Sequence, residues 1–323
     1  MAEKLLEVQH LRTHFFTRSG VVKAVEDVSF HIDEGETLGL VGESGCGKSV
    51  TSLSLLRLLE SPPGKIVGGQ VLFQGEDILH MSRDELNELR GGKAAMIFQD
   101  PMTSLNPVYP VGYQIAEAVK AHLKMDDRAA MNRAVEMLDR VRIPEARRRL
   151  NHYPHEFSGG MRQRVMIAIA LSCNPQLLIA DEPTTALDVT IQAQVLDLMK
   201  GLAQEFRTAT LLITHDLGVV AGSCDRVDVM YAGRIVEAAP TKLVFSKPAH
   251  PYTQALLAAV PRADTPKGSR LAAIGGQPPN LVNLPPGCPF APRCAKVQQR
   301  CRVELPPLET VGPDQQAACF YPY

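Results

Sequence analysis

The residues from Gly42 to Ser49 have the types and spacing that could hold a chain of phosphates. They read Gly-Glu-Ser-Gly-Cys-Gly-Lys-Ser and match the pattern G-x-x-x-x-G-K-[S/T]. A short apolar run, 37–41, precedes them, and an apolar stretch from Val50 to Leu59 that suits a helix follows. Glycines let backbone N–H groups turn toward an anion at a helix start, where the helix dipole favours negative charge. The sequence therefore predicts a nucleoside triphosphate site.

Two side chains of this loop carry the expected chemistry. Lys48 would reach the β- and γ-phosphates, and the Ser49 hydroxyl would bind Mg²⁺. We interpret Cys46 as a small filler of the loop rather than a nucleophile. The expected nucleotide contacts here are Gly42, Ser44, Gly45, Cys46, Gly47, Lys48, Ser49 and Val50.

Further along, two apolar runs that suit buried strands end in polar side chains. The run from Leu177 ends at Asp181 and Glu182, and the run from Leu211 ends at His215. Active sites of α/β proteins lie at the carboxyl ends of parallel strands. Asp181 would then lie beside Mg²⁺ and Glu182 would face the attacking water, while His215 would touch the γ-phosphate or orient that water.

Two more features could contact a nucleotide. Ser158 suits a helix N-cap, and with Gly159 and Gly160 it begins a helix that predicts a second anion site. Phe15 or Phe16 could stack on an adenine ring, because an aromatic face binds a base with little sequence demand. A core or edge-strand aromatic is an equally good interpretation of that pair.

Length and composition favour a globular protein of about two domains. The chain has 323 residues, of which 45% are hydrophobic and 21% charged. Strand-like alternation fills residues 4–41, and the helical pattern of 111–143 predicts a helical subdomain inserted into an α/β core. A net charge of −1 argues against nucleic acid as a partner. With no signal peptide pattern and no apolar run of about 18 residues, we expect a cytoplasmic location that includes the membrane face.

The last part of the chain has a different composition. Residues 261–289 are rich in proline, which predicts a linker, and the tail is too short to bury a good core unaided. We therefore divide the chain into 1–260 and 261–323. Four cysteines in the tail predict a metal or cluster site, because four thiolates can hold either a zinc ion or an iron–sulfur cluster. These cysteines are Cys288, Cys294, Cys301 and Cys319. The spacings between them are wider than those of zinc knuckles, which favours an iron–sulfur cluster.

Residues 157–161, Phe-Ser-Gly-Gly-Met, resemble the LSGGQ signature of ABC-type ATPases, with Phe at the first position and Met at the last. The loop 42–49 is similar to the Walker A motif of that family and Leu177–Asp181 to Walker B. The resemblance implies an α/β ATPase domain with a RecA-like core, an antiparallel β subdomain and an inserted helical subdomain. It also implies roles for single residues: Gln99 as the Q-loop glutamine near Mg²⁺, Glu182 as the general base, Asp188 in the D-loop 186–188, and His215 as the switch histidine. In such families the signature of one ATPase subunit completes the phosphate site of a second.

Two other stretches, 99–107 and 250–257, resemble the dipeptide/oligopeptide importer branch, which nickel and glutathione importers share. In that branch the four-cysteine motif is linked to a [4Fe–4S] cluster. The resemblance implies ATP and Mg²⁺, a second ATPase subunit (a heterodimer is favoured, a homodimer possible), two transmembrane permease subunits and an extracytoplasmic substrate-binding protein.

Three functions therefore compete. The first is ATP hydrolysis that drives peptide uptake, or uptake of nickel or glutathione. The second is a soluble ABC ATPase acting on DNA or the ribosome, which the single cassette and the absence of a coiled coil make a weak alternative. The third is a regulatory scaffold with a redox-sensing tail.

Overall fold

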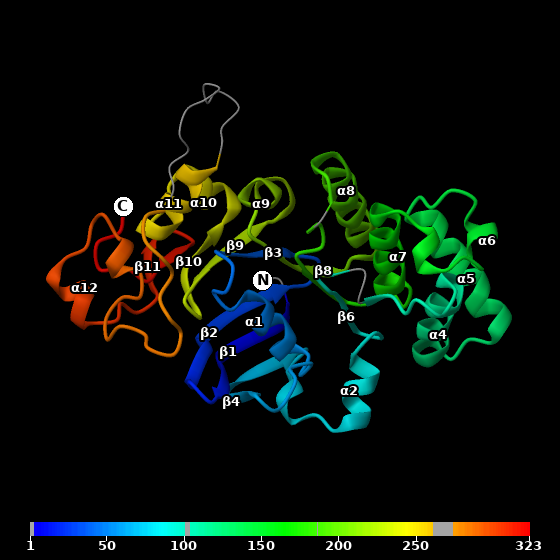
Figure 1. Cartoon of the computed structure of the whole chain (residues 1–323), viewed down its shortest axis with the longest axis horizontal. Helices are drawn as coiled ribbons and strands as arrows, with labels where there is room; N and C mark the ends of the chain where they lie inside the picture. The colour runs from blue at the N-terminus through cyan, green and yellow to red at the C-terminus, as the bar shows by residue number, and fades with distance from the viewer. Residues whose placement is uncertain (1–2, 101–103, 186, 261–273) are drawn as a thin grey trace. The chain divides into compact units, whose positions relative to one another are not determined.

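The computed structural model describes residues 3–100, 104–185, 187–260 and 274–323 (Figure 1). The chain forms two compact units. The first, which we term the helical unit, comprises Met1–Leu5, Ile32–Thr37 and His80–Ile213. The second, the phosphate-loop unit, comprises Leu6–His31, Leu38–Leu79 and Thr214–Tyr323. The predicted division at residue 260 stays a prediction.

Three parallel strands form the centre of the helical unit. β7 (Leu177–Asp181) pairs with β6 (Ala94–Ile97) on one side and with β8 (Ala209–Thr214) on the other. All residues of β7 and β8 are buried, as expected for apolar runs in a parallel sheet covered on both faces. Because the strands are parallel, their carboxyl ends lie at one edge, where Asp181 ends β7 and Gln99 and Glu182 follow β6 and β7.

The helical unit also contains several α-helices. They are α2 (Arg83–Leu89), α4 (Val111–Leu123), α5 (Asp127–Arg140), α6 (Ala146–Arg149), α7 (Gly159–Leu171) and α8 (Val189–Phe206). α7 contacts β6 as well as α4 and α5, so it connects the strands to the helical group (Figure 1). The predicted helical block 111–143 is thus confirmed. A capping box at Ser82 begins α2.

An antiparallel sheet lies in the phosphate-loop unit. Its order is β2 (Gly20–Asp33), β1 (Lys4–Thr17), β4 (Gly64–Phe73) and β5 (Glu76–Asp77). After β5, residues Ile78–His80 form only a short 3₁₀ helix. The helix after the phosphate loop, α1 (Lys48–Leu55), is shorter than the apolar pattern to Leu59 predicted.

One strand from the N-terminal part of the chain pairs with a set of strands from the C-terminal half. β3 (Thr37–Val41) runs parallel to β9 (Arg226–Tyr231), which forms a hairpin with β10 (Arg234–Pro240). β12 (Gln315–Ala317) pairs with β10, and β11 (Glu309–Gly312) pairs with β12. The sequence did not predict these last two strands, because they are short and largely polar. The remaining helices are α9 (Leu217–Ser223), α10 (Thr241–Ser246), α11 (Pro251–Ala259) and α12 (Gln299–Val303).

The tail packs onto the core of its unit through aromatic rings. Phe290 lies 5.3 Å from both Tyr231 and Tyr252, measured between ring centroids. The buried Glu237 carboxylate of β10 accepts hydrogen bonds from the backbone N–H of His250 and from the Gln315 side chain, both at 2.8 Å. These contacts connect Phe290 and Gln315 of the tail to β9, β10 and α11. Among the described residues, no helix is both long and apolar enough to cross a membrane.

Candidate nucleotide site and cysteine pocket

The phosphate loop leads from β3 into α1 and depends on glycine at two tightly packed positions. Gly42 has φ +156° and Gly47 has φ +110°, in the region that L side chains rarely adopt. A Cβ on Gly42 would overlap the carbonyl oxygen of Met230, and a Cβ on Gly47 would overlap that of Ala24. The loop backbone therefore passes directly against neighbouring strands, which determines its path.

Lys48 is held by the carbonyls of its own loop. Its buried Nζ donates hydrogen bonds to the Gly42 oxygen at 2.7 Å and to the Glu43 oxygen at 3.1 Å. An ammonium group at this point can bind a phosphate, because it is a compact positive charge. The structure thus places the lysine within the curve of the loop that the sequence pattern predicted.

Cys46 is buried in the same loop. Burial raises the pKa of its thiol, which therefore stays protonated at neutral pH. Its backbone oxygen accepts a hydrogen bond at 2.8 Å from the N–H of Gly233, in the turn between β9 and β10. Cys46 consequently has the character of a packing residue, since a nucleophilic cysteine needs a thiolate.

We expect Gly47→Ala to lower the free energy of unfolding by at least about 2 kcal/mol, since the substitution adds a steric overlap to an unfavourable φ. ATP binding should fall with it. Gly35→Ala is the matched control, because Gly35 also has a positive φ, +71°, but no neighbouring atom within 4 Å of an added Cβ. That control should cost about 1 kcal/mol. Urea unfolding measures both, and equal losses would contradict the overlap at Gly47.

Two predicted residues contact each other at the carboxyl ends of the parallel strands in the helical unit. Gln99 follows β6, and its Nε2 donates a hydrogen bond at 3.0 Å to Oε2 of Glu182, which follows β7. Thr185, which the sequence analysis missed, donates from Oγ1 to the same oxygen at 2.9 Å. Both side chains donate to the same carboxylate oxygen and thereby orient the Glu182 side chain.

The backbone also holds Glu182 in an unusual conformation. Its φ is +46°, uncommon for a residue with a side chain, and its N–H donates to the Ile213 oxygen of β8 at 2.9 Å. Asp181, one residue earlier, is buried at the end of β7. A strained residue held by neighbouring strands is frequent at functional sites.

The predicted signature segment begins α7. Ser158 is its N-cap and accepts a hydrogen bond from the Met161 N–H at 3.4 Å, as predicted. Asp188 caps α8 in the same way, accepting from the Ile191 N–H at 3.0 Å. A Cβ on Gly160 would lie 2.7 Å from Cγ2 of Ile191, so the two helix starts pack closely. Of the D-loop 186–188, Ala186 lies outside the described residues.

The remaining predicted nucleotide contacts lie in the phosphate-loop unit. His215 is exposed between β8 and α9, and the next residue, Asp216, caps α9. Phe15 and Phe16 are neighbours in β1, where Phe16 is 52% exposed and Phe15 is paired opposite Gly64.

The four tail cysteines come together. Cys288, Cys294, Cys301 and Cys319 line one small cavity of about 20 Å³, beside His250 and Phe290. Burial raises the pKa of Cys288 to about 11 and also raises those of Cys294 and Cys319. Within the part of the chain that the structure describes, however, no three His, Cys, Asp or Glu side chains are grouped so as to hold a metal ion.

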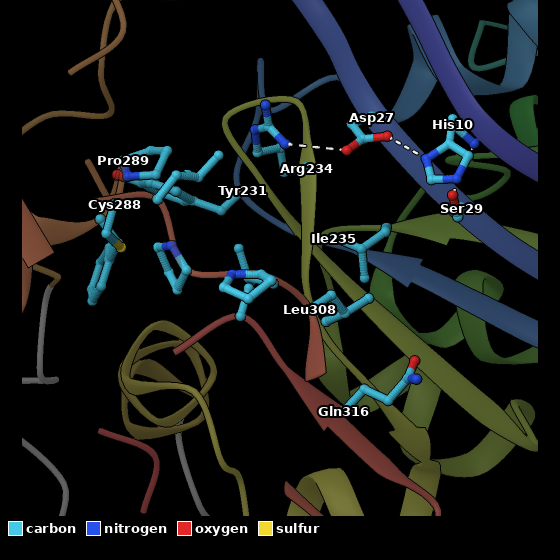
Figure 2. A pocket seen from close by; sticks show the side chains of 16 residues that line it. His10, Asp27, Ser29, Tyr231, Arg234, Ile235, Cys288, Pro289, Leu308 and Gln316 are labelled. Carbon is cyan, nitrogen blue, oxygen red and sulfur yellow. Dashed lines mark hydrogen bonds and ion pairs between the residues drawn. The ribbon is translucent and has the colours of Figure 1, made fainter. Parts of the chain in front are cut away.

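A larger cavity of about 520 Å³, which the sequence did not predict, lies between the tail and the hairpin of β9 and β10 (Figure 2). Polar groups lie at one side, where Asp27 accepts from His10 at 2.7 Å and pairs with Arg234 at 3.9 Å. Leu308 and Pro289 contribute apolar surface.

Three features together define a P-loop ATPase of the ABC class. They are a glycine-rich phosphate loop with its lysine, two carboxylates at the end of a buried strand, and a helix that begins with an N-cap serine and two glycines. Comparison with known proteins agrees. Residues 25–185 match the family described as ABC transporter, and residues 236–301 match the oligopeptide/dipeptide transporter C-terminal region.

Individual relatives extend the match over nearly the whole chain. The chain is 54% identical over 319 residues to the probable peptide ABC transporter ATP-binding protein y4tR of Sinorhizobium fredii, covering 99% of this chain and 95% of that protein. It is 55% identical over 321 residues to the oligopeptide transport ATP-binding protein OppD of Salmonella typhimurium, with the same coverage. The dimeric ATP-binding cassette MJ0796, solved in a post-hydrolysis state with ADP and Pi, superimposes with a TM-score of 0.66 at 27% identity, over 73% of this chain and 98% of that one.

The chain therefore belongs to the ABC transporter family, among the ATP-binding proteins of its oligopeptide/dipeptide branch, and it hydrolyses ATP. The expected fold class is confirmed, including the cysteine-rich tail. The predicted iron–sulfur cluster finds no support in these comparisons or in the metal-ligand grouping of the described residues.

Proposed function

We propose that this chain couples ATP binding and hydrolysis to the uptake of dipeptides and oligopeptides through separate membrane subunits. The observation that carries the proposal is the match of residues 236–301 to the oligopeptide/dipeptide transporter C-terminal region. Relatives named as peptide transport ATP-binding proteins, aligned over 99% of the chain, support it. The chain would act at the cytoplasmic face of the membrane, with two permease subunits and, indirectly, an extracytoplasmic binding protein that delivers the peptide.

We further propose that the loop from Gly42 to Val50 binds the phosphates of ATP. The loop fits this task because Gly42 and Gly47 leave no room for a Cβ and Lys48 lies within the curve. Mg²⁺ would be held by Ser49, Asp181 and Gln99, an all-oxygen donor set of the kind Mg²⁺ prefers. The ion would neutralise charge on the phosphates.

Glu182 would act as general base and polarise the attacking water, with His215 contacting the γ-phosphate. The hydrogen bonds that Gln99 and Thr185 donate to Glu182 support this role, because they orient a carboxylate that must accept a proton. Phe16, the more exposed of the two aromatics, is the better candidate to stack on adenine, and Phe15 is the alternative.

Two ATPase subunits would associate head to tail, so that Ser158, Gly159 and Gly160 of one contact the ATP of the other, with Asp188 at the same junction. The N-cap geometry of α7 supports an anion contact there. We favour a heterodimer with a related ATPase, and a homodimer is the alternative.

The four tail cysteines would hold a [4Fe–4S] cluster, with a zinc ion as the alternative. Their meeting at one cavity supports this, since four thiolates suit either group. The cluster would cross-link four positions of the short tail and thereby stabilise its fold.

Metal analysis of protein purified without oxygen tests the cluster. We expect about four irons per chain with matching sulfide and broad visible absorption. Cys319→Ser should lose the iron, whereas Cys224→Ala, a cysteine outside the pocket, should keep it. One zinc without colour would identify the alternative, and absence of both metals would refute a metal site.

An uptake assay tests the transport proposal. Cells that depend on this chain should lose uptake of labelled oligopeptides when the chain is deleted and regain it with the intact chain. Loss of nickel or glutathione uptake with normal peptide uptake would assign those substrates instead.

A further inference from the structure

The tail and the phosphate loop are joined by a largely buried ion pair. Arg293 donates from Nη1 to Oε2 of Glu43 at 2.6 Å and from Nη2 to Oε1 at 2.9 Å. The arginine side chain is 3% exposed and the glutamate 26%. A bidentate pair of this kind fixes relative direction as well as distance, and salt screens it little in such surroundings.

Glu43 is itself the second residue of the phosphate loop, and its backbone is held at both ends. Its N–H donates to the Tyr252 hydroxyl of α11 at 2.9 Å. Its carbonyl oxygen accepts from Nζ of Lys48 at 3.1 Å. One residue therefore connects the tail, α11 and the lysine expected to contact phosphate.

The arginine is equally well oriented from its own side. Its Nε donates to the Gly275 oxygen at 2.9 Å, and its Nη1 also reaches the Tyr231 hydroxyl at 3.3 Å. The guanidinium carbon lies 6.0 Å from the centre of the Phe290 ring, within reach of a cation–π contact. These contacts leave the guanidinium little freedom to turn, so it acts as a fixed anchor for Glu43.

We propose that Arg293 is a positioning residue of the ATPase: through Glu43 it holds the phosphate loop in the conformation that receives ATP. A glycine-rich loop loses much conformational entropy when it closes around phosphates, and a preformed loop avoids part of that loss. The tail, whatever its cysteines bind, thereby contributes to nucleotide affinity. The inference rests on the ATPase activity alone and requires neither a metal in the cysteine pocket nor a peptide substrate.

The competing explanation is that Arg293 merely fastens the tail to its unit. The two explanations differ in how Arg293 and Glu43 combine. If the arginine acts on ATP through Glu43, removing both partners should cost no more than removing either one. If it only stabilises the tail, its effect should combine independently with that of Glu43.

Equilibrium binding of ATP to the full chain, without Mg²⁺ so that hydrolysis is prevented, tests the proposal. We expect Arg293→Gln, Glu43→Gln and the double variant each to raise the Kd for ATP by about tenfold, a typical effect for a charged hydrogen bond. Arg293→Lys, which keeps the charge but not the fork, should give an intermediate loss. Arg300→Gln is the matched control, because Arg300 is in the same tail but pairs with Glu304 at an exposed site; its Kd should stay within about twofold of the unaltered chain.

Two results would overturn the proposal. One is an unchanged Kd in a folded Arg293→Gln variant. The other is a double variant whose loss is the product of the single losses, about a hundredfold. Should Arg293→Gln fail to fold, Glu43→Gln and Arg293→Lys decide the question: the first leaves the tail's own contacts intact and the second retains the positive charge, so an unchanged Kd in both would refute positioning.

Discussion

Glu182→Gln should bind ATP normally but hydrolyse it about 10²–10³-fold more slowly, the usual contribution of a positioned general base. Glutamine has almost the same shape as glutamate and keeps an oxygen that can accept from Gln99 and Thr185. It cannot take a proton from water. ATP should then hold two ATPase subunits together, because the step that separates them is blocked.

Phosphate release measures the first effect, and size-exclusion chromatography with and without ATP measures the second. Glu205→Gln is a suitable control, since Glu205 is an exposed glutamate of the same unit that pairs with Arg140. It should hydrolyse ATP at the unaltered rate. Near-normal hydrolysis by Glu182→Gln would show that another group activates the water.

Lys48→Ala should weaken ATP binding itself, by ten- to a hundredfold, in line with about 1.5–3 kcal/mol for a hydrogen bond that involves a charged group. Lys48 is buried, and its ammonium now bonds to the Gly42 and Glu43 oxygens. Its removal takes away the expected partner of the phosphates and also loosens the loop. Hydrolysis should fall as a consequence of lost binding.

A direct binding measurement separates the effects of Lys48 and Glu182: affinity falls in the first variant and is kept in the second. Lys65→Ala is the control, because Lys65 is an exposed lysine of β4 in the same unit. Its affinity should equal that of the unaltered chain. An unchanged Kd in folded Lys48→Ala would refute the role of Lys48.

Local pattern was sufficient for much of the architecture. The apolar run before Asp181 predicted a buried parallel strand, and residues 177–181 form one. Ser158 was recognisable as an N-cap because capping involves groups only three residues apart. Boundaries were less predictable, as at α1, which ends at Leu55 although the apolar pattern continues.

The tail shows where local pattern fails. Its polar strands β11 and β12 owe their existence to pairing with β10. Such pairing depends on a partner strand far away in sequence, and the local pattern of short polar segments does not predict it. The clustering of the four cysteines was expected, but His250 and Phe290 beside them were not.

By itself the sequence determined the class of chemistry, since a phosphate loop, an acidic strand end and a signature segment are contiguous motifs whose function follows from local backbone geometry. The tertiary structure decided which side chains support them. Thr185 meets Glu182, and Arg293 reaches Glu43 across 250 positions of the chain. The physical reason is that hydrogen bonds and ion pairs depend on distances of about 3 Å in space, which only the packing of distant strands and loops establishes.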